Sequence, residues 1–156
     1  MTPGPGGVSV GGDGEAMVGA HQVRRGGSVT DAGMYVQESG PAYAPAVLFL
    51  HGAGASGGMW RAHAAGLDGF RCLAPDLPGF GRSNHLAWRS REATADLVAE
   101  LVAERAAAGR AHVVGLSWGG GIAHTLLARH PHVVDRAVID GAGVLTWWAR
   151  PLVLAG

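Results

Sequence analysis

The sequence predicts an α/β fold, in which a mostly parallel sheet carries helices on both of its faces. Two observations indicate this class. Short apolar segments with strand character alternate along the chain with segments that have helical character, which is the pattern of βαβ units. Residues 46–50 are apolar at every position, as expected for a strand that is covered on both faces. The length of 156 residues suits a single domain.

The composition excludes several functional classes. Apolar residues make up 47% of the chain and charged residues 15%, which favours a folded core over a wholly disordered chain. Twelve basic residues balance twelve acidic ones, so a nucleic-acid partner is not expected. The single cysteine, Cys72, and the spacing of the histidines predict neither an intramolecular disulfide nor a metal site. With no membrane span and no secretory signal visible, we expect a cytoplasmic protein.

The start of the chain differs in character from the rest. Residues 1–27 are rich in glycine and nearly free of large apolar side chains, so they cannot bury enough surface to offset the entropy of ordering. We therefore expect a flexible tail over 1–27 and a core over 28–156. The first strands of that core are expected at 34–37 and at 46–50, with a proline-bracketed loop between them.

The middle of the chain contains the clearest predicted helix. A short helix over 58–67 and a strand over 71–74 precede it. Ser90 suits the N-cap of a helix over 90–108, and Gly109 suits its C-terminal stop. One face of this helix is apolar, with Leu97, Val98, Leu101 and Val102 at helical spacing.

Three further segments complete the alternation. A strand is expected at 111–114 and a helix at 118–130, which Pro131 ends. Another strand is expected at 136–139. The expected elements therefore form repeated βαβ units, as a parallel sheet requires.

A nucleophile motif joins the last predicted helix to the strand before it. Residues 115–119 read Gly-Leu-Ser-Trp-Gly and match the pattern G-x-S-x-G in the strand-to-helix context that this motif requires. The sharp, strained turn holds the hydroxyl of Ser117 clear of the sheet. Gly115 and Gly119 let the strand and the helix approach closely, and the backbone N–H of Trp118 can face a developing oxyanion.

A second glycine-flanked segment follows the apolar strand 46–50. Residues 51–54 read His-Gly-Ala-Gly. Acyl transfer requires another backbone N–H that meets the carbonyl oxygen from the side opposite the nucleophile. We expect the N–H of Ala53 to be this donor.

Three motifs in order resemble the α/β-hydrolase fold superfamily. They are residues 51–54, the segment Asp-Leu-Pro-Gly-Phe-Gly-Arg-Ser at 76–83, and residues 115–119. The similarity covers roughly residues 34 to 148. The resemblance implies a serine hydrolase without a cofactor, acting on a small ester, amide, lactone or related carbonyl compound.

The same resemblance assigns roles to individual residues. It implies Ser117 as the nucleophile, with the N–H groups of Ala53 and Trp118 as the oxyanion hole. It implies a structural role for Asp76 and Arg82. The residues that support the motifs are His51, Gly52, Gly115 and Gly119.

The acid and the base of the family are harder to assign. The family order is serine, acid, histidine, and the histidine that acts as base would lie beyond residue 156. None of the eight histidines occupies that place. Asp140 stands where a minority of relatives carry the acid, but the same position suits a carboxylate that caps a loop. We favour the capping role and keep Asp140 as the candidate acid.

These observations predict a truncated hydrolase core. Residues 144–154 resemble the entry to the cap that covers the substrate pocket of the family. Because a serine hydroxyl is a poor nucleophile without a base, we expect this chain alone to be a weak catalyst or inactive.

Two other interpretations stay open. Residues 52–57 match G-x-G-x-x-G after a strand, and Asp76 follows at the end of another strand, as in a dinucleotide-binding fold. That interpretation leaves the G-x-S-x-G motif unexplained. The other interpretation is a non-enzymatic remnant or binding module that keeps the hydrolase fold.

Overall fold

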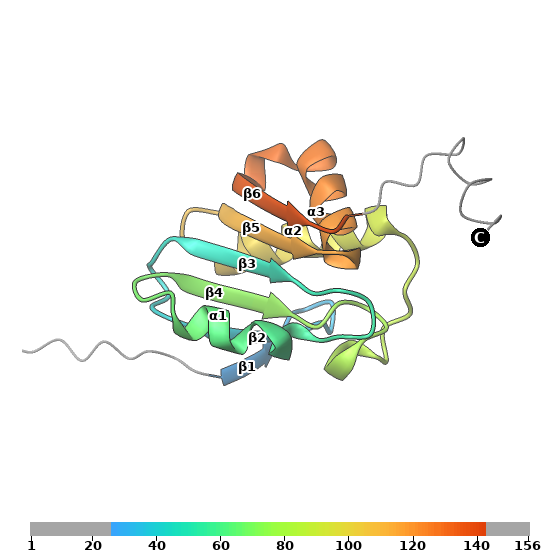
Figure 1. Ribbon diagram of the computed structural model, residues 1–156, viewed down its shortest axis with the longest axis horizontal. Coiled ribbons are helices and arrows are strands. Elements are labelled where there is room, and N and C mark those ends of the chain that lie inside the picture. Colours follow the sequence, from blue (N-terminus) through green and yellow to red (C-terminus); the bar gives the residue numbers. More distant parts are fainter. Residues whose placement is uncertain (1–25, 143–156) are drawn as a thin grey trace, which may run out of the picture.

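The computed structural model describes residues 26–142 of the chain. The predicted tail up to residue 25 and the predicted cap entry at 144–154 lie outside the described residues. The described part is a six-stranded sheet flanked by helices (Figure 1). Its strands are β1 (Gly26–Val29), β2 (Tyr35–Ser39), β3 (Ala46–Leu50), β4 (Arg71–Pro75), β5 (Ala111–Leu116) and β6 (Val134–Asp140).

The strand order confirms a mostly parallel sheet. The order is β1-β2-β4-β3-β5-β6, in which β4, β3, β5 and β6 run parallel and the β1–β2 and β2–β4 pairs are antiparallel. The apolar segment at 46–50 forms β3, a central strand that is buried at every position. This burial is the reason that the segment shows no polar alternation.

Helices cover both faces of the sheet, as predicted. The α-helices are α1 (Arg61–Ala65), α2 (Arg91–Arg105) and α3 (Trp118–Arg129), and short 3-10 helices occupy η1 (Gly57–Trp60), η2 (Gly81–Ser83) and η3 (Pro131–Val133). Successive side chains of β3 point to opposite faces. Leu48 and Leu50 join the main apolar cluster with residues of α2 and α3, whereas Val47 and Phe49 pack with Trp60 beside α1.

The predicted tail over 1–27 is wrong at its last two residues. Gly26 and Gly27 belong to β1 and pair with Glu38 and Gln37 of β2. Pairing to a neighbouring strand supplies hydrogen bonds that composition alone does not reveal. A Cβ on Gly27 would lie 1.9 Å from the hydroxyl of Tyr35, so a side chain there would require the tyrosine ring to move.

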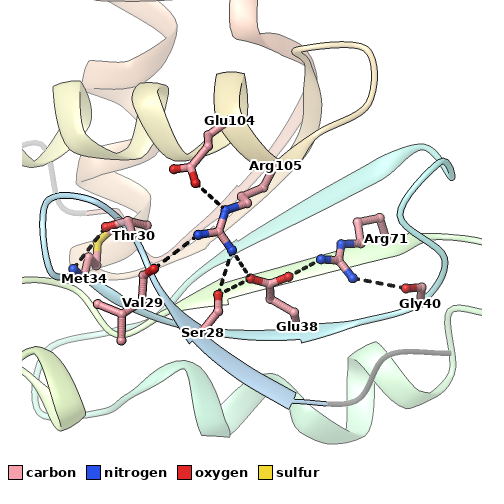
Figure 2. A network of polar contacts seen from close by, with 9 residues as sticks. All are labelled: Ser28, Val29, Thr30, Met34, Glu38, Gly40, Arg71, Glu104 and Arg105. Atoms are coloured by element: carbon pink, nitrogen blue, oxygen red, sulfur yellow. Dashed lines mark hydrogen bonds and ion pairs between the residues drawn. The ribbon is translucent and has the colours of Figure 1, made fainter. Parts of the chain in front are cut away.

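A buried carboxylate ties β1, β2, β4 and α2 together (Figure 2). Glu38 of β2 forms an ion pair with Arg71 of β4 and another with Arg105 of α2, whose Nη1 lies 2.7 Å from Oε1 of Glu38. Ser28 of β1 also donates to Glu38. The network joins the antiparallel edge of the sheet to α2.

Candidate active site

Ser117 occupies a strained turn between β5 and α3. Its φ of 51° and ψ of −110° make it the one non-glycine residue with positive φ among residues 26–142. The turn is held by two backbone hydrogen bonds, from the N–H of Ser117 to the carbonyl of Asp140 at 2.7 Å and from the N–H of Gly121 to the carbonyl of Ser117 at 3.1 Å. Ser117 is exposed at the point where β5 ends. This is the geometry that the sequence motif predicts.

The motif glycines are required by close backbone contacts. A Cβ on Gly119 would lie 2.2 Å from the carbonyl oxygen of Leu50, and one on Gly115 would lie 2.7 Å from the carbonyl oxygen of Gly119. Such contacts are below the distance that real Cβ atoms show. The start of α3 therefore packs directly onto the backbones of β3 and β5, which sets the position of Ser117.

The segment 51–54 lies beside Ser117. A Cβ added to Gly52 would lie 3.7 Å from the Cβ of Ser117 and 3.7 Å from the carbonyl oxygen of Leu116, so Gly52 faces the end of β5. Ala53 is the next residue along the chain and is exposed, and Gly54 follows with a φ of +74°. The structure thus brings together all three segments that the motifs single out, because 51–54 lies beside 115–119 and the N–H of Leu77 in 76–83 donates to His51.

His51 is fully buried and uses both of its ring nitrogens. Nε2 accepts a hydrogen bond from the N–H of Leu77 at 2.9 Å, so the proton lies on Nδ1, which donates to the carbonyl of Gly52 at 2.8 Å. Burial lowers the pKa of His51 and keeps the ring neutral. Because Nε2 already accepts a hydrogen bond, His51 has no free lone pair to take a proton from Ser117. Its two hydrogen bonds instead link the segment 51–54 to the segment 76–83.

Asp76 is also committed to the backbone. Its Oδ1 accepts from the N–H of Gly57 at 2.7 Å, and its Oδ2 accepts from the N–H of Arg82 at 2.8 Å. The side chain is 2% exposed, so neither oxygen can reach a ribose hydroxyl. Residues 57–60 form a 3-10 turn rather than the long helix of a dinucleotide site. The geometry disfavours the dinucleotide interpretation.

The side chains of Asp76 and Arg82 in the segment 76–83 make structural contacts and do not contact Ser117. Arg82 donates to the hydroxyl of Tyr35 at 2.8 Å and stacks over the ring of that tyrosine. A cavity of about 610 Å³ lies on this side of the sheet, between β2 and α1. Ser117 does not line this cavity, so the cavity is separate from the proposed nucleophile.

A sequence model of the alpha/beta hydrolase fold matches residues 45–154 of the chain. The chain belongs to the α/β-hydrolase fold family. The matching range contains β3 to β6, α1 to α3 and all three motifs.

Individual relatives agree with this membership in the α/β-hydrolase family. The chain is 40% identical over 101 residues to an esterase of Mycobacterium tuberculosis (strain ATCC 25618 / H37Rv). The matched residues cover 62% of this chain and 32% of the esterase. It is 30% identical over 129 residues to an AB hydrolase superfamily protein of Gibberella zeae, covering 80% of this chain and 45% of that protein.

Solved structures of α/β hydrolases superpose on the same core. A structure of the M. tuberculosis esterase has a TM-score of 0.63 and 34% identity, covering 75% of this chain and 40% of the esterase. A structure of an N-acyl homoserine lactonase has a TM-score of 0.61 and 28% identity, covering 77% of this chain and 45% of the lactonase. The chain therefore spans less than half the length of these relatives.

In this α/β-hydrolase chain, no described residue is placed to act as the base for Ser117. No side chain within 26–142 forms a hydrogen bond with the Ser117 hydroxyl. Asp140 ends β6, its backbone carbonyl accepts from Ser117, and its carboxylate is exposed and makes no hydrogen bond or ion pair in the same range. The contact that holds the turn comes from the backbone of Asp140.

Sequence reasoning missed one residue near the site. The ring of Trp88, from the loop before α2, packs against the ring of Trp118 with centroids 5.4 Å apart. Trp88 belongs to none of the three motifs. The contact joins segments that are distant in sequence, so no spacing pattern could have indicated it.

No helix in the range 26–142 is both long enough and apolar enough to cross a bilayer.

Proposed function

We propose that this chain carries the nucleophile and the oxyanion hole of a serine hydrolase. The observation that carries the proposal is the backbone of Ser117, which adopts a strained conformation at the exposed end of β5. A non-glycine residue keeps such a conformation only where the surrounding structure enforces it, and such residues cluster at functional sites. Here the enforcing contacts are those of Gly115 and Gly119.

The proposed chemistry is acyl transfer. The Oγ of Ser117 gives its proton to a base from solution as it attacks a carbonyl carbon, and the tetrahedral intermediate that forms has a negatively charged oxygen. The backbone N–H groups of Ala53 and Trp118 donate to that oxygen. The bond to the leaving group then breaks, and the leaving group departs with a proton as the acyl-enzyme forms. Water adds to the acyl carbon, the ester bond to Ser117 breaks, and the acid is released while Ser117 regains its proton. The placement of residues 51–54 against Ser117 supports this assignment of the two donors.

The proposed substrates are small carbonyl compounds, namely esters, amides or lactones. Relatives of this chain include an esterase and an N-acyl homoserine lactonase, which supports this range. Within the chain, Asp140 stays the candidate acid. No described histidine serves as the base, so we expect slow chemistry from this chain alone.

Chemical rescue tests the proposal. Free imidazole should act as the base that Ser117 lacks, because a general base in solution can take the hydroxyl proton. We expect a fluorophosphonate to label the chain at a rate that rises with imidazole concentration, and peptide mass spectrometry to locate the adduct on Ser117. The Ser117→Ala variant should give no adduct at that peptide.

Two outcomes contradict the proposal. If the folded chain takes no label at Ser117 at any imidazole concentration, the non-enzymatic interpretation is favoured. If Ser117→Ala is labelled as fast as the parent chain, the reactive group lies elsewhere. Far-ultraviolet circular dichroism of both proteins shows whether the fold is retained.

A further inference from the structure

The loop before α2 brings a second aromatic ring to the proposed nucleophile. Trp88 lies two residues before Ser90, the N-cap of α2. Its ring plane makes an angle of 54° with that of Trp118, at 5.4 Å between centroids. Trp118 directly follows Ser117 in the chain. The pair therefore forms an aromatic surface that starts at the residue directly after the proposed nucleophile.

The two rings of this surface differ in burial. Trp118 is partly buried against the main apolar cluster, whereas Trp88 is 45% exposed. A large aromatic ring left in water retains apolar area that a ligand can cover. The surface thus has a supported inner ring and an open outer ring.

Packing holds both rings in place. The Nε1–H of Trp118 is buried and has no acceptor among residues 26–142, so contacts with neighbouring groups rather than a hydrogen bond orient this ring. On the other side, the backbone of Gly79 approaches Trp88, since a Cβ on Gly79 would lie 3.7 Å from the Cβ of Trp88. The loop that carries Trp88 is therefore packed against the segment 76–83.

We propose that Trp88 is a specificity-determining residue. Together with Trp118 it binds a flat, apolar aryl or unsaturated acyl part of the substrate beside Ser117. This inference rests on the proposed function of Ser117 and adds a substrate class to it. A planar ring makes offset or edge contacts with two indoles, whereas a saturated ring of similar bulk makes fewer of them.

Binding is tested in the Ser117→Ala background, so that the result does not depend on catalysis. The chain is labelled with ¹⁵N at its tryptophan indoles and titrated with 2-naphthyl acetate or with decahydro-2-naphthyl acetate, which has a saturated ring system of the same size. We expect the naphthyl ester to shift the indole signals of Trp88 and Trp118 saturably and to bind more tightly than the saturated ester. Trp88→Ala should weaken naphthyl binding roughly 2- to 12-fold, the range that aromatic pairs contribute.

Two further variants make the test specific. Trp88→Leu keeps an apolar side chain and should lose the preference for the naphthyl ester, which a merely structural role of Trp88 would not change. Tyr43→Ala removes an exposed aromatic ring before β3, at the opposite end of the parallel strands from Ser117, and should leave both affinities unchanged.

The outcomes separate this inference from the proposed function. The absence of a saturable shift, or an equal loss of affinity for both esters in Trp88→Ala, overturns the role of Trp88. Failure of fluorophosphonate labelling at Ser117 overturns the nucleophile, whatever the indole titration gives. Loss of the far-ultraviolet signal of coupled indoles in Trp88→Ala would verify the ring contact in solution.

Discussion

Individual residues show how the same side chain serves chemistry or structure according to its partners. His51 and Asp76 are residue types that often act in catalysis, yet each is buried and uses its hydrogen-bonding atoms on backbone groups. Ser117, in contrast, is an exposed residue whose backbone is held by its neighbours. Partners and exposure, rather than residue type, therefore decide which groups are available for chemistry.

Substitution of two glycines in the first turns of α3 should give opposite results. Gly119→Ala places a Cβ 2.2 Å from the carbonyl oxygen of Leu50, a backbone atom that cannot yield easily. We expect a loss of about 1–3 kcal/mol or more in the free energy of unfolding, measured by urea denaturation. Gly121→Ala is the matched control. Its nearest contact would be the flexible side chain of Arg91 at 3.6 Å, so stability should stay equal or rise by up to about 1 kcal/mol.

The burial of His51 predicts a pH dependence of stability. Burial lowers its pKa in the folded chain, while the unfolded chain binds a proton near pH 6.5. Below that pH the unfolded state therefore holds more protons, and stability falls as the pH drops from about 7 towards the lowered pKa. We expect the wild type to lose more stability over this interval than His51→Gln. If the wild type and His51→Gln lose the same free energy of unfolding between these pH values, as measured by urea denaturation, this role of His51 is contradicted.

At the scale of elements, local sequence patterns predicted where helices and strands lie more accurately than they predicted the residues at which these elements end. The N-cap at Ser90 is confirmed, since its Oγ accepts from the N–H of Ala93 at 3.1 Å. The helix predicted over 90–108 ends at Arg105, three residues early, and Gly109 follows in a turn with a φ of +63°. Helix ends depend on packing as well as on the residue that can stop them.

The network around Glu38 should be important for the edge of the sheet. Glu38→Gln removes the charge that compensates Arg71, whose side chain is 7% exposed. Because breaking a buried ion pair leaves an unpaired charge, we expect a loss of about 3–5 kcal/mol in the free energy of unfolding. Asp96→Asn is the control, because its carboxylate, which pairs with Arg129 and His130, is 40% exposed and should contribute less. Equal effects of the two variants would contradict the role of the network.

At the scale of the whole molecule, the sheet is unevenly covered. Both central strands, β3 and β4, are buried throughout, whereas β6 is exposed over most of its length and pairs only with β5 in the described range. Val138 of β6 is 64% exposed. An exposed strand edge with apolar side chains can pair with another chain.

Self-association should therefore depend on β6. We expect light scattering to detect association of the chain that grows with concentration, and Val138→Lys to reduce it because a lysine on an edge strand disfavours pairing. Ala128→Lys adds the same charge at an exposed position of α3 and should have less effect. If both variants reduce scattering equally, net charge rather than the β6 edge is responsible.

The sequence alone determined the motifs and most of the elements, β2 to β6 and α1 to α3. The uniform apolar run at 46–50 and the strand-to-helix setting of Ser117 are local patterns, and the structure bears out both. Only the tertiary structure decided the strand order, the inclusion of Gly26 and Gly27 in β1, the occupied nitrogens of His51 and the contact of Trp88 with Trp118. These features join residues that are far apart along the chain, and their free energy arises from packing and hydrogen bonds that no local spacing encodes.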